Sequence, residues 1–186
     1  RNVPRFPHAL THAVALAAAA ASETIVAAVG GKVKVDVKWP NDLLVDGRKL
    51  AGILSVTGPI KQLMTDIESY AAPEFVVVGL GLNVGWAPEG AACLQECATA
   101  EVERDAVLSA LLGALDRLLD LTPVQLHERY RAKLSTLRRA VRIELPSGEF
   151  VEGRALDVEA DGRLVVLDSC GVTQRLDVGD IIHLRS

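Results

Sequence analysis

The sequence predicts a protein of α+β class that carries a small β-barrel at its C-terminal end. Three observations predict it: an alanine-rich stretch long enough for a core helix, an Asp-Gly pair between two strand-like segments, and a series of short strand-like segments beyond residue 140. About five such strands fit into residues 140–186, which is typical of a small barrel. We therefore expect two domains, residues 1–139 and residues 140–186.

The first expected element is a helix over residues 9–29, ALTHAVALAAAAASETIVAAV. This run is apolar enough to resemble a signal peptide or a membrane span, but His12 and Glu23 interrupt it and alanine dominates over leucine. We expect a buried core helix, with no membrane association, that ends at Gly30 and Gly31 as C-terminal caps.

A strand and a hairpin follow the helix. Valine alternates with other residues over 32–39, which predicts a strand, and residues 42–45 and 48–56 predict the two arms of a hairpin. Asp46-Gly47 between these arms is the strongest short hairpin signal. Residues 57–73 show no regular pattern, so we expect irregular structure there.

The second half of the first domain predicts one strand and two helices. Residues 74–85, EFVVVGLGLNVG, are apolar and run into glycines, which is typical of a central strand buried on both faces. Apolar spacing predicts a helix over 103–120, and Thr122-Pro123 forms a good start for another over 123–138. The positions expected to face the core in the first of these helices are Val107, Leu111, Leu115 and Leu118.

Composition limits the classes of function. Apolar residues make up 49% of the 186-residue chain, which favours a buried core over disorder. The net charge of −4 lacks the basic footprint of a nucleic-acid-binding protein. The three cysteines, Cys93, Cys97 and Cys170, match no zinc spacing, so we expect reduced thiols in a cytoplasmic protein.

Charged and amide side chains crowd the hairpin, and its geometry brings two of them together. If Asp46-Gly47 is a two-residue turn, Leu44 pairs with Lys49 and Asp42 pairs with Ala51. Asp42 and Lys49 then lie on one face as diagonal neighbours, about 7–8 Å apart at the backbone. A structural salt bridge is the simplest interpretation of this pair alone.

The neighbouring polar groups shift the interpretation towards a binding site. A salt bridge does not need Lys38 and Asn41 beside it, and Pro40 interrupts the strand so that Asn41 and Asp42 are displayed. Asp42 and Asn41 offer the oxygen ligands that Mg²⁺ prefers, and Lys49 offers a charge for a phosphate or an oxyanion. These residues predict phosphate chemistry on a nucleotide.

Three segments together resemble the biotin–protein ligase family, also called biotin–[acetyl-CoA-carboxylase] ligase: KWPNDLLVDGRKLAGIL (38–54), VVVGLGLNV (76–84) and GDIIHLRS (179–186). The resemblance covers nearly the whole chain from residue 8 onward. It implies a mixed-sheet catalytic domain related to class II aminoacyl-tRNA synthetases, followed by an SH3-like barrel. It also implies that biotin and ATP, with Mg²⁺, form biotinyl-5′-AMP, and that biotin then passes to a lysine of the biotin carboxyl carrier domain of a carboxylase.

The resemblance also implies roles for particular residues. Lys49 matches a lysine that contacts the biotin carboxylate and the α-phosphate, and Asp42 matches a carboxylate at the reacting centre that can orient the carrier lysine or, with Asn41, a metal ion. The further positions expected at biotin or the nucleotide are Asn41, Gly52, Gly81, Asn83 and Arg185. Lys38 and Trp39 are expected to support the hairpin, Trp86 is expected to be a packing group, and a homodimer is allowed.

One departure from the family pattern leaves alternatives open. Family members carry a strand with small hydroxyl residues and a GRGRxGR loop before the first helix, and neither occurs in the 186 residues. We therefore expect the chain to be a fragment that alone forms little or no biotinyl-AMP. A lipoate- or octanoyl-transferring relative and a catalytically incompetent binding fragment are the two alternatives. The sequence does not identify the carrier protein, the oligomeric state or an upstream DNA-binding domain.

Overall fold

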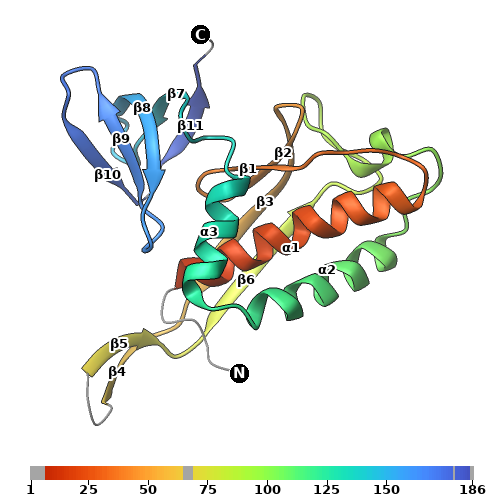
Figure 1. The fold of residues 1–186 in the computed structure, drawn as a ribbon, viewed down its shortest axis with the longest axis horizontal. Helices are drawn as coiled ribbons and strands as arrows, with labels where there is room; N and C mark the ends of the chain where they lie inside the picture. The colour runs from red at the N-terminus through yellow and green to blue at the C-terminus, as the bar shows by residue number, and fades with distance from the viewer. Residues whose placement is uncertain (1–6, 65–68, 178, 185–186) are drawn as a thin grey trace.

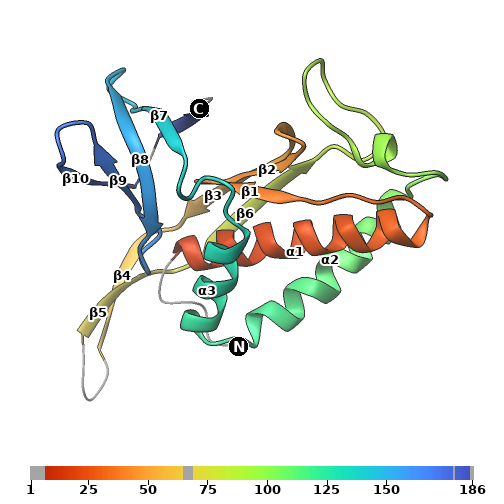
Figure 2. The ribbon, with the colours of Figure 1, turned by 45° about the horizontal axis from the view of Figure 1, so that its top comes forward.

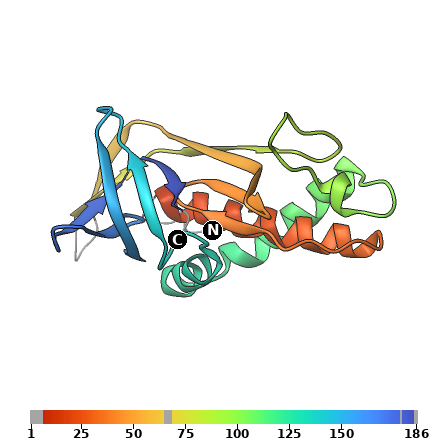
Figure 3. The same ribbon diagram turned by 90° about the horizontal axis from the view of Figure 1, so that it is seen from above.

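Helices and strands of the first part of the chain form two layers, and a second sheet follows them (Figure 1). The structure is a computed structural model that describes residues 7–64, 69–177 and 179–184. The helical layer contains α1 (Pro7–Ala28), α2 (Arg104–Leu119) and α3 (Pro123–Lys133). The strand layer is an antiparallel sheet in the order β1-β2-β3-β6, with β1 (Asp36–Lys38), β2 (Asp42–Val45), β3 (Arg48–Thr57) and β6 (Val76–Leu82). Figure 3 shows that the strands of this sheet lie on one side of α1, whereas α3 lies on the opposite side of α1.

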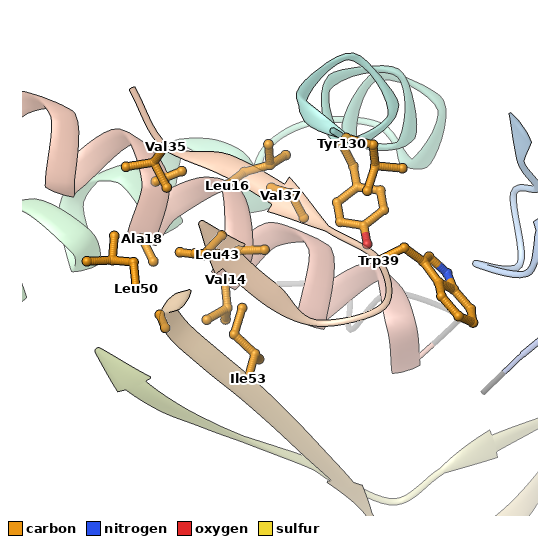
Figure 4. Packing of buried hydrophobic residues seen from close by; sticks show 14 of the residues in the cluster. Val14, Leu16, Ala18, Val35, Val37, Trp39, Leu43, Leu50, Ile53 and Tyr130 are labelled. Carbon is orange, nitrogen blue, oxygen red and sulfur yellow. The ribbon is translucent and has the colours of Figure 1, made fainter. Parts of the chain in front are cut away.

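The alanine-rich segment forms the core helix, as predicted. Ala13, Ala17 and Ala18 are fully buried, and such small side chains let the backbone of α1 approach the sheet and α2 closely (Figure 4). The helix is long and apolar enough to cross a membrane by length and composition alone, but 67% of its apolar window is buried within the fold, as in a core helix. Gly30 ends it with a φ of +77°, a conformation that glycine adopts at little cost.

The predicted hairpin is confirmed, whereas the prediction of irregular structure after it is wrong. Asp46 and Gly47 both have positive φ, 49° and 79°, as a two-residue hairpin turn requires. The described residues of the 57–73 range are not irregular: β4 (Ile60–Met64) and β5 (Ser69–Pro73) pair antiparallel in a second two-stranded unit that extends from the body (Figure 2). The Gly58 N–H donates to the Phe75 carbonyl and the Glu74 N–H to the Pro59 carbonyl, which carries the β3–β6 pairing into this unit. Local residue patterns do not reveal such long-range pairing.

The strand β6 was predicted to be central and buried on both faces, and the structure does not place it so. Within the part of the chain that the structure describes, β6 pairs with β3 alone and lies at the sheet edge. Its residues alternate between half-buried and exposed, and Val77 is 58% exposed. An unbroken apolar run therefore does not distinguish an edge strand from a central one.

Both later helices form, and the second is shorter than predicted. In α2 the buried residues are Val107, Leu111, Ala114 and Leu118, while Leu115 is partly buried. Thr122 caps α3 in a reciprocal capping box with Gln125. The helix ends at Lys133 rather than near residue 138, because the next residues extend alongside β1: Leu134 forms a parallel bridge with Val37, and Ser135 donates to the Val37 carbonyl.

The C-terminal residues form the predicted small SH3-like barrel. Its five antiparallel strands stand in the order β10-β9-β8-β7-β11 and enclose buried Ile143, Val151, Leu164, Val166 and Ile181. They are β7 (Ala140–Glu144), β8 (Phe150–Val158), β9 (Leu164–Asp168), β10 (Thr173–Leu176) and β11 (Asp180–His183). This sheet starts at Ala140, and the division into two domains at residue 139 stays a prediction.

Candidate active site

A cleft of about 1020 Å³ lies between the outer face of the four-stranded sheet, away from α1, and strand β11 of the barrel. Five of the sequence-predicted site residues line it: Asn41, Asp42, Lys49, Gly52 and Gly81. The barrel contributes Asp180, Ile182 and His183 from the opposite wall. The fold thus brings the hairpin residues together and adds three barrel residues that the sequence did not predict at the site.

The register of the hairpin differs from the predicted one by a β-bulge. Val45 pairs with Arg48 and Leu44 with Lys49 as expected, but the pairing then shifts, so that Asp42 faces Gly52 instead of Ala51. The cause is the apolar pair Leu50-Ala51: both side chains are buried, at 0% and 1% exposure, which strict alternation would not allow. The bulge therefore puts a glycine, not an alanine, beside the charged pair.

Lys49 and Asp42 form the charged centre of the cleft. The Lys49 Nζ lies 2.7 Å from the Asp42 Oδ1. The lysine side chain is 55% exposed and that of the aspartate is 15% exposed. The ammonium is therefore accessible to a ligand, and the more deeply buried carboxylate holds the ammonium in place. An ion pair with this much exposure contributes little to stability, roughly 0–1 kcal/mol.

Bare backbone forms the floor next to this pair. Gly52 pairs with Gly81 across β3 and β6, and the pair two positions further along, Leu54 with Gly79, also includes a glycine. A Cβ on Gly52 would lie 3.3 Å from the Lys49 Nζ and 3.5 Å from the Asp42 Oδ1, whereas one on Gly81 would meet only the Gly52 carbonyl, at 4.0 Å. The glycines leave room for a flat ligand against the sheet, and Gly52 also leaves room for the lysine.

Asn41 holds the backbone of the site. Its Nδ2 donates to the Ile53 carbonyl at 2.6 Å, and the Ile53 N–H donates back to the Asn41 carbonyl at 2.9 Å. A magnesium site built by the protein does not fit these contacts, because the Lys49 ammonium already occupies the place beside Asp42. Over residues 7–64, 69–177 and 179–184, no group of three His, Cys, Asp or Glu side chains could hold a metal ion.

One predicted site residue, Asn83, lies outside this cleft. Asn83 lines a second hollow of about 480 Å³ together with Leu82 and Trp86, on the side of α2. Its Nδ2 donates to the Ala92 carbonyl at 3.0 Å and is 3.4 Å from the Lys49 carbonyl, so it supports the backbone of the lysine strand. Trp86, expected to be a packing group, is 74% exposed. Arg185 lies outside the described residues.

The barrel wall contains contacts that the sequence did not predict. Lys38, expected only to support the hairpin, extends its Nζ to within 3.3 Å of the Asp180 Oδ1. His183 lies near Thr136, and burial, with the charges of Arg139 and Lys38, lowers its pKa. Lys38 and Asp180 are 142 positions apart, and no local sequence signal connects such distant segments.

A two-layer α+β body followed by an SH3-like barrel is the architecture of biotin protein ligases. Residues 3–66 match the family described as "Biotin/lipoate A/B protein ligase family", and residues 136–184 match "Biotin protein ligase C terminal domain". The chain belongs to the biotin protein ligase family.

Curated relatives agree with this assignment. The chain is 40% identical to the biotin–[acetyl-CoA-carboxylase] ligase of Mycobacterium tuberculosis over 157 residues, which cover 80% of the chain and 53% of that protein. It is 27% identical to the bifunctional ligase/repressor BirA of Bacillus subtilis over 172 residues, 84% of the chain and 48% of that protein. The chain thus spans about half the length of these relatives.

Solved structures show the same fold. The apo structure of the biotin protein ligase from Aquifex aeolicus superposes with a TM-score of 0.72 at 21% identity, over 96% of this chain and 76% of that one. The same protein in complex with biotin and ATP gives a TM-score of 0.67 at 21% identity, over 96% and 72%.

Proposed function

We propose that the protein containing this chain activates biotin with ATP and transfers it to one lysine of a biotin carboxyl carrier domain. The observation that carries the proposal is the Lys49–Asp42 pair, 2.7 Å apart, in an open cleft of a chain that belongs to the biotin protein ligase family. The names of its relatives, ligases that act on acetyl-CoA-carboxylase, support the carboxylase carrier as acceptor.

The first step joins two anions, and Lys49 is suited to it. A carboxylate oxygen of biotin attacks the α-phosphorus of ATP; an O–P bond forms, and the bond to the bridging oxygen of the β-phosphate breaks to release pyrophosphate. A cation between the carboxylate and the phosphate stabilises the negative charge that develops there. Asp42 orients this cation from below, and the bare backbone at Gly52 and Gly81 lets the ligand lie against the sheet.

The second step transfers the acyl group. The neutral amine of the carrier lysine attacks the acyl carbon of biotinyl-5′-AMP, a C–N bond forms, the C–O bond to the phosphate breaks, and AMP leaves while the nitrogen loses a proton to solvent. Asp42 orients the incoming amine. Since the residues do not fit a protein-built magnesium site, Mg²⁺ enters this proposal only with the phosphates of ATP. A cytoplasmic location and a homodimer stay predictions.

Substrate discrimination tests the proposal in the complete protein. We expect pyrophosphate release that requires both ATP and biotin, and a mass increase of one biotinyl group on a purified carrier domain, abolished when its acceptor lysine is replaced by arginine. Lipoate and octanoate are the matched alternative acids. Pyrophosphate release with either of these and none with biotin would identify a lipoate-type relative, and biotin binding without release would identify a catalytically incompetent binding protein. Both outcomes contradict the proposal.

A further inference from the structure

The turn between β1 and β2 places Asp42 at the cleft, and buried side chains hold this turn in position. Lys38 pairs with Asp42 across this turn, so only residues 39–41 connect the two strands. Pro40 has no N–H to donate, so on the side of β3 the turn is held at its end, where Asn41 and Ile53 exchange hydrogen bonds. The position of the Asp42 carboxylate depends on whatever holds these three residues.

Tyr130 of α3 holds the turn at its centre. Its hydroxyl donates to the Pro40 carbonyl at 3.0 Å, and Figure 4 shows the hydroxyl turned towards the chain beside Trp39. The Tyr130 side chain is 0% exposed, and its ring stacks on His12 of α1 with the ring centroids 3.5 Å apart. A buried ring clamped in this way cannot follow a displaced carbonyl, so the hydrogen bond has one geometry.

Thr136 and the barrel hold the turn at its start. The Trp39 N–H donates to the Thr136 Oγ1 at 3.1 Å, and the Trp39 indole N–H donates to the carbonyl of Gly162, between β8 and β9, at 2.9 Å. Trp39 and Thr136 are 1% and 0% exposed. The buried indole therefore connects the barrel to the turn that precedes Asp42.

We infer that Tyr130 and Thr136 are positioning residues for the cleft: they fix the 39–41 turn and thereby hold Asp42 against Lys49. The inference rests on the proposed function for its kinetic consequence, but the geometric consequence stands without it. Displacement of a reacting group by about 1 Å costs about 10²-fold in rate, so loss of one support lowers kcat while the fold persists.

Two conservative variants of the complete protein test the inference. Tyr130→Phe and Thr136→Val each remove a hydroxyl and keep the buried volume. Ser22→Ala is the control, because the fully buried Ser22 hydroxyl donates to the Ala18 carbonyl at 2.7 Å, within α1. We expect about a tenfold loss of kcat in both test variants, a tenfold change being 1.36 kcal/mol in the barrier, and an unchanged kcat in the control.

A double-mutant cycle separates positioning from general stability. Combined with Asp42→Asn, Tyr130→Phe should cost no further rate, because the residue through which it acts is already altered. Equal fold losses of kcat in both backgrounds, or a loss that merely follows a lower Tm, would overturn the inference.

Chemical labelling of Lys49 tests the geometry without any assay of activity. A lysine freed from its carboxylate reacts faster with an acylating reagent, so we expect severalfold faster labelling of Lys49 in both test variants, up to the rate in Asp42→Asn. Lys133, paired with Glu23 at 2.7 Å, should label at an unchanged rate in every variant. Wild-type labelling of Lys49 in both test variants would refute positioning. Absence of biotin activation in every form, with faster labelling, would refute only the proposed function.

Discussion

Replacing Lys49 by methionine should separate the stability of the fold from its chemistry. The Lys49 side chain is 55% exposed and is paired in the cleft with Asp42, which is 15% exposed, so the variant should lose about 1 kcal/mol of unfolding free energy or less. The rate of biotin activation should fall far more, by about 10²–10³-fold, as when one group that stabilises transition-state charge is removed.

The adjacent Arg48 offers a matched control. It lies on the same strand, its guanidinium is 2.8 Å from Glu96, and both side chains of this pair are 44% exposed. Arg48→Met should lose a similar small amount of unfolding free energy and keep the wild-type rate. Urea denaturation gives the first quantity, and biotin-dependent exchange of pyrophosphate into ATP gives the second.

The refuting result is the reverse pattern. If Lys49→Met unfolds at a much lower urea concentration than Arg48→Met, and the fraction that is folded keeps the wild-type exchange rate, the Lys49–Asp42 pair is a structural salt bridge. The simplest interpretation of the hairpin would then be correct.

The other predictions concern the cleft floor and acid stability. Gly52→Ala should lower kcat severalfold with little change in Tm, because the new Cβ would press on Lys49 at 3.3 Å. In Gly81→Ala the new Cβ meets no atom closer than 4.0 Å, so this variant should keep the wild-type rate of Lys49 labelling. Equal rates of Lys49 labelling in the two variants would contradict the reasoning. Burial, with the charges of His8 and His127, lowers the pKa of His12 from 6.5 to about 3. Since the folded state disfavours the protonated form, the stability is complete above pH 6.5 and falls as the pH drops towards 3, by about 1 kcal/mol between pH 7 and pH 5.5. Urea denaturation at these two pH values measures it, and His12→Phe should reduce the difference and leave the part that His8 and His183 contribute, since burial lowers the pKa of both.

The features that could be predicted from the sequence are those that depend on nearby residues. Asp46-Gly47 determines its own turn because both residues adopt positive φ, and Gly30 ends α1 for the same reason. Lys49 and Asp42 meet because a two-residue turn brings positions seven apart onto one face. All of these interactions close within a few residues of the signal.

The features that could not be predicted depend on distant partners. The edge position of β6 and the β4–β5 unit follow from pairing between β3 and β6, which no local periodicity reports. The barrel wall of the cleft comes from β11, far along the chain from Lys38. The bulge was predictable in principle, since Leu50-Ala51 breaks the alternation and a glycine follows, but apolar residues in succession are ambiguous without knowledge of the core that buries them.

Because of the bulge in β3, the geometry of the cleft depends more on the number of residues in this segment than on the identity of most of them. Between the Asp46-Gly47 turn and Gly52, one inserted or deleted residue would interchange the inward and outward sides of the strand, turning the ammonium into the hydrocarbon interior or a leucine into water. Substitutions there can be absorbed one at a time, but a change in length cannot. Loop grafting, circular permutation and the design of chimaeras should therefore keep residues 42–52 together and at constant length.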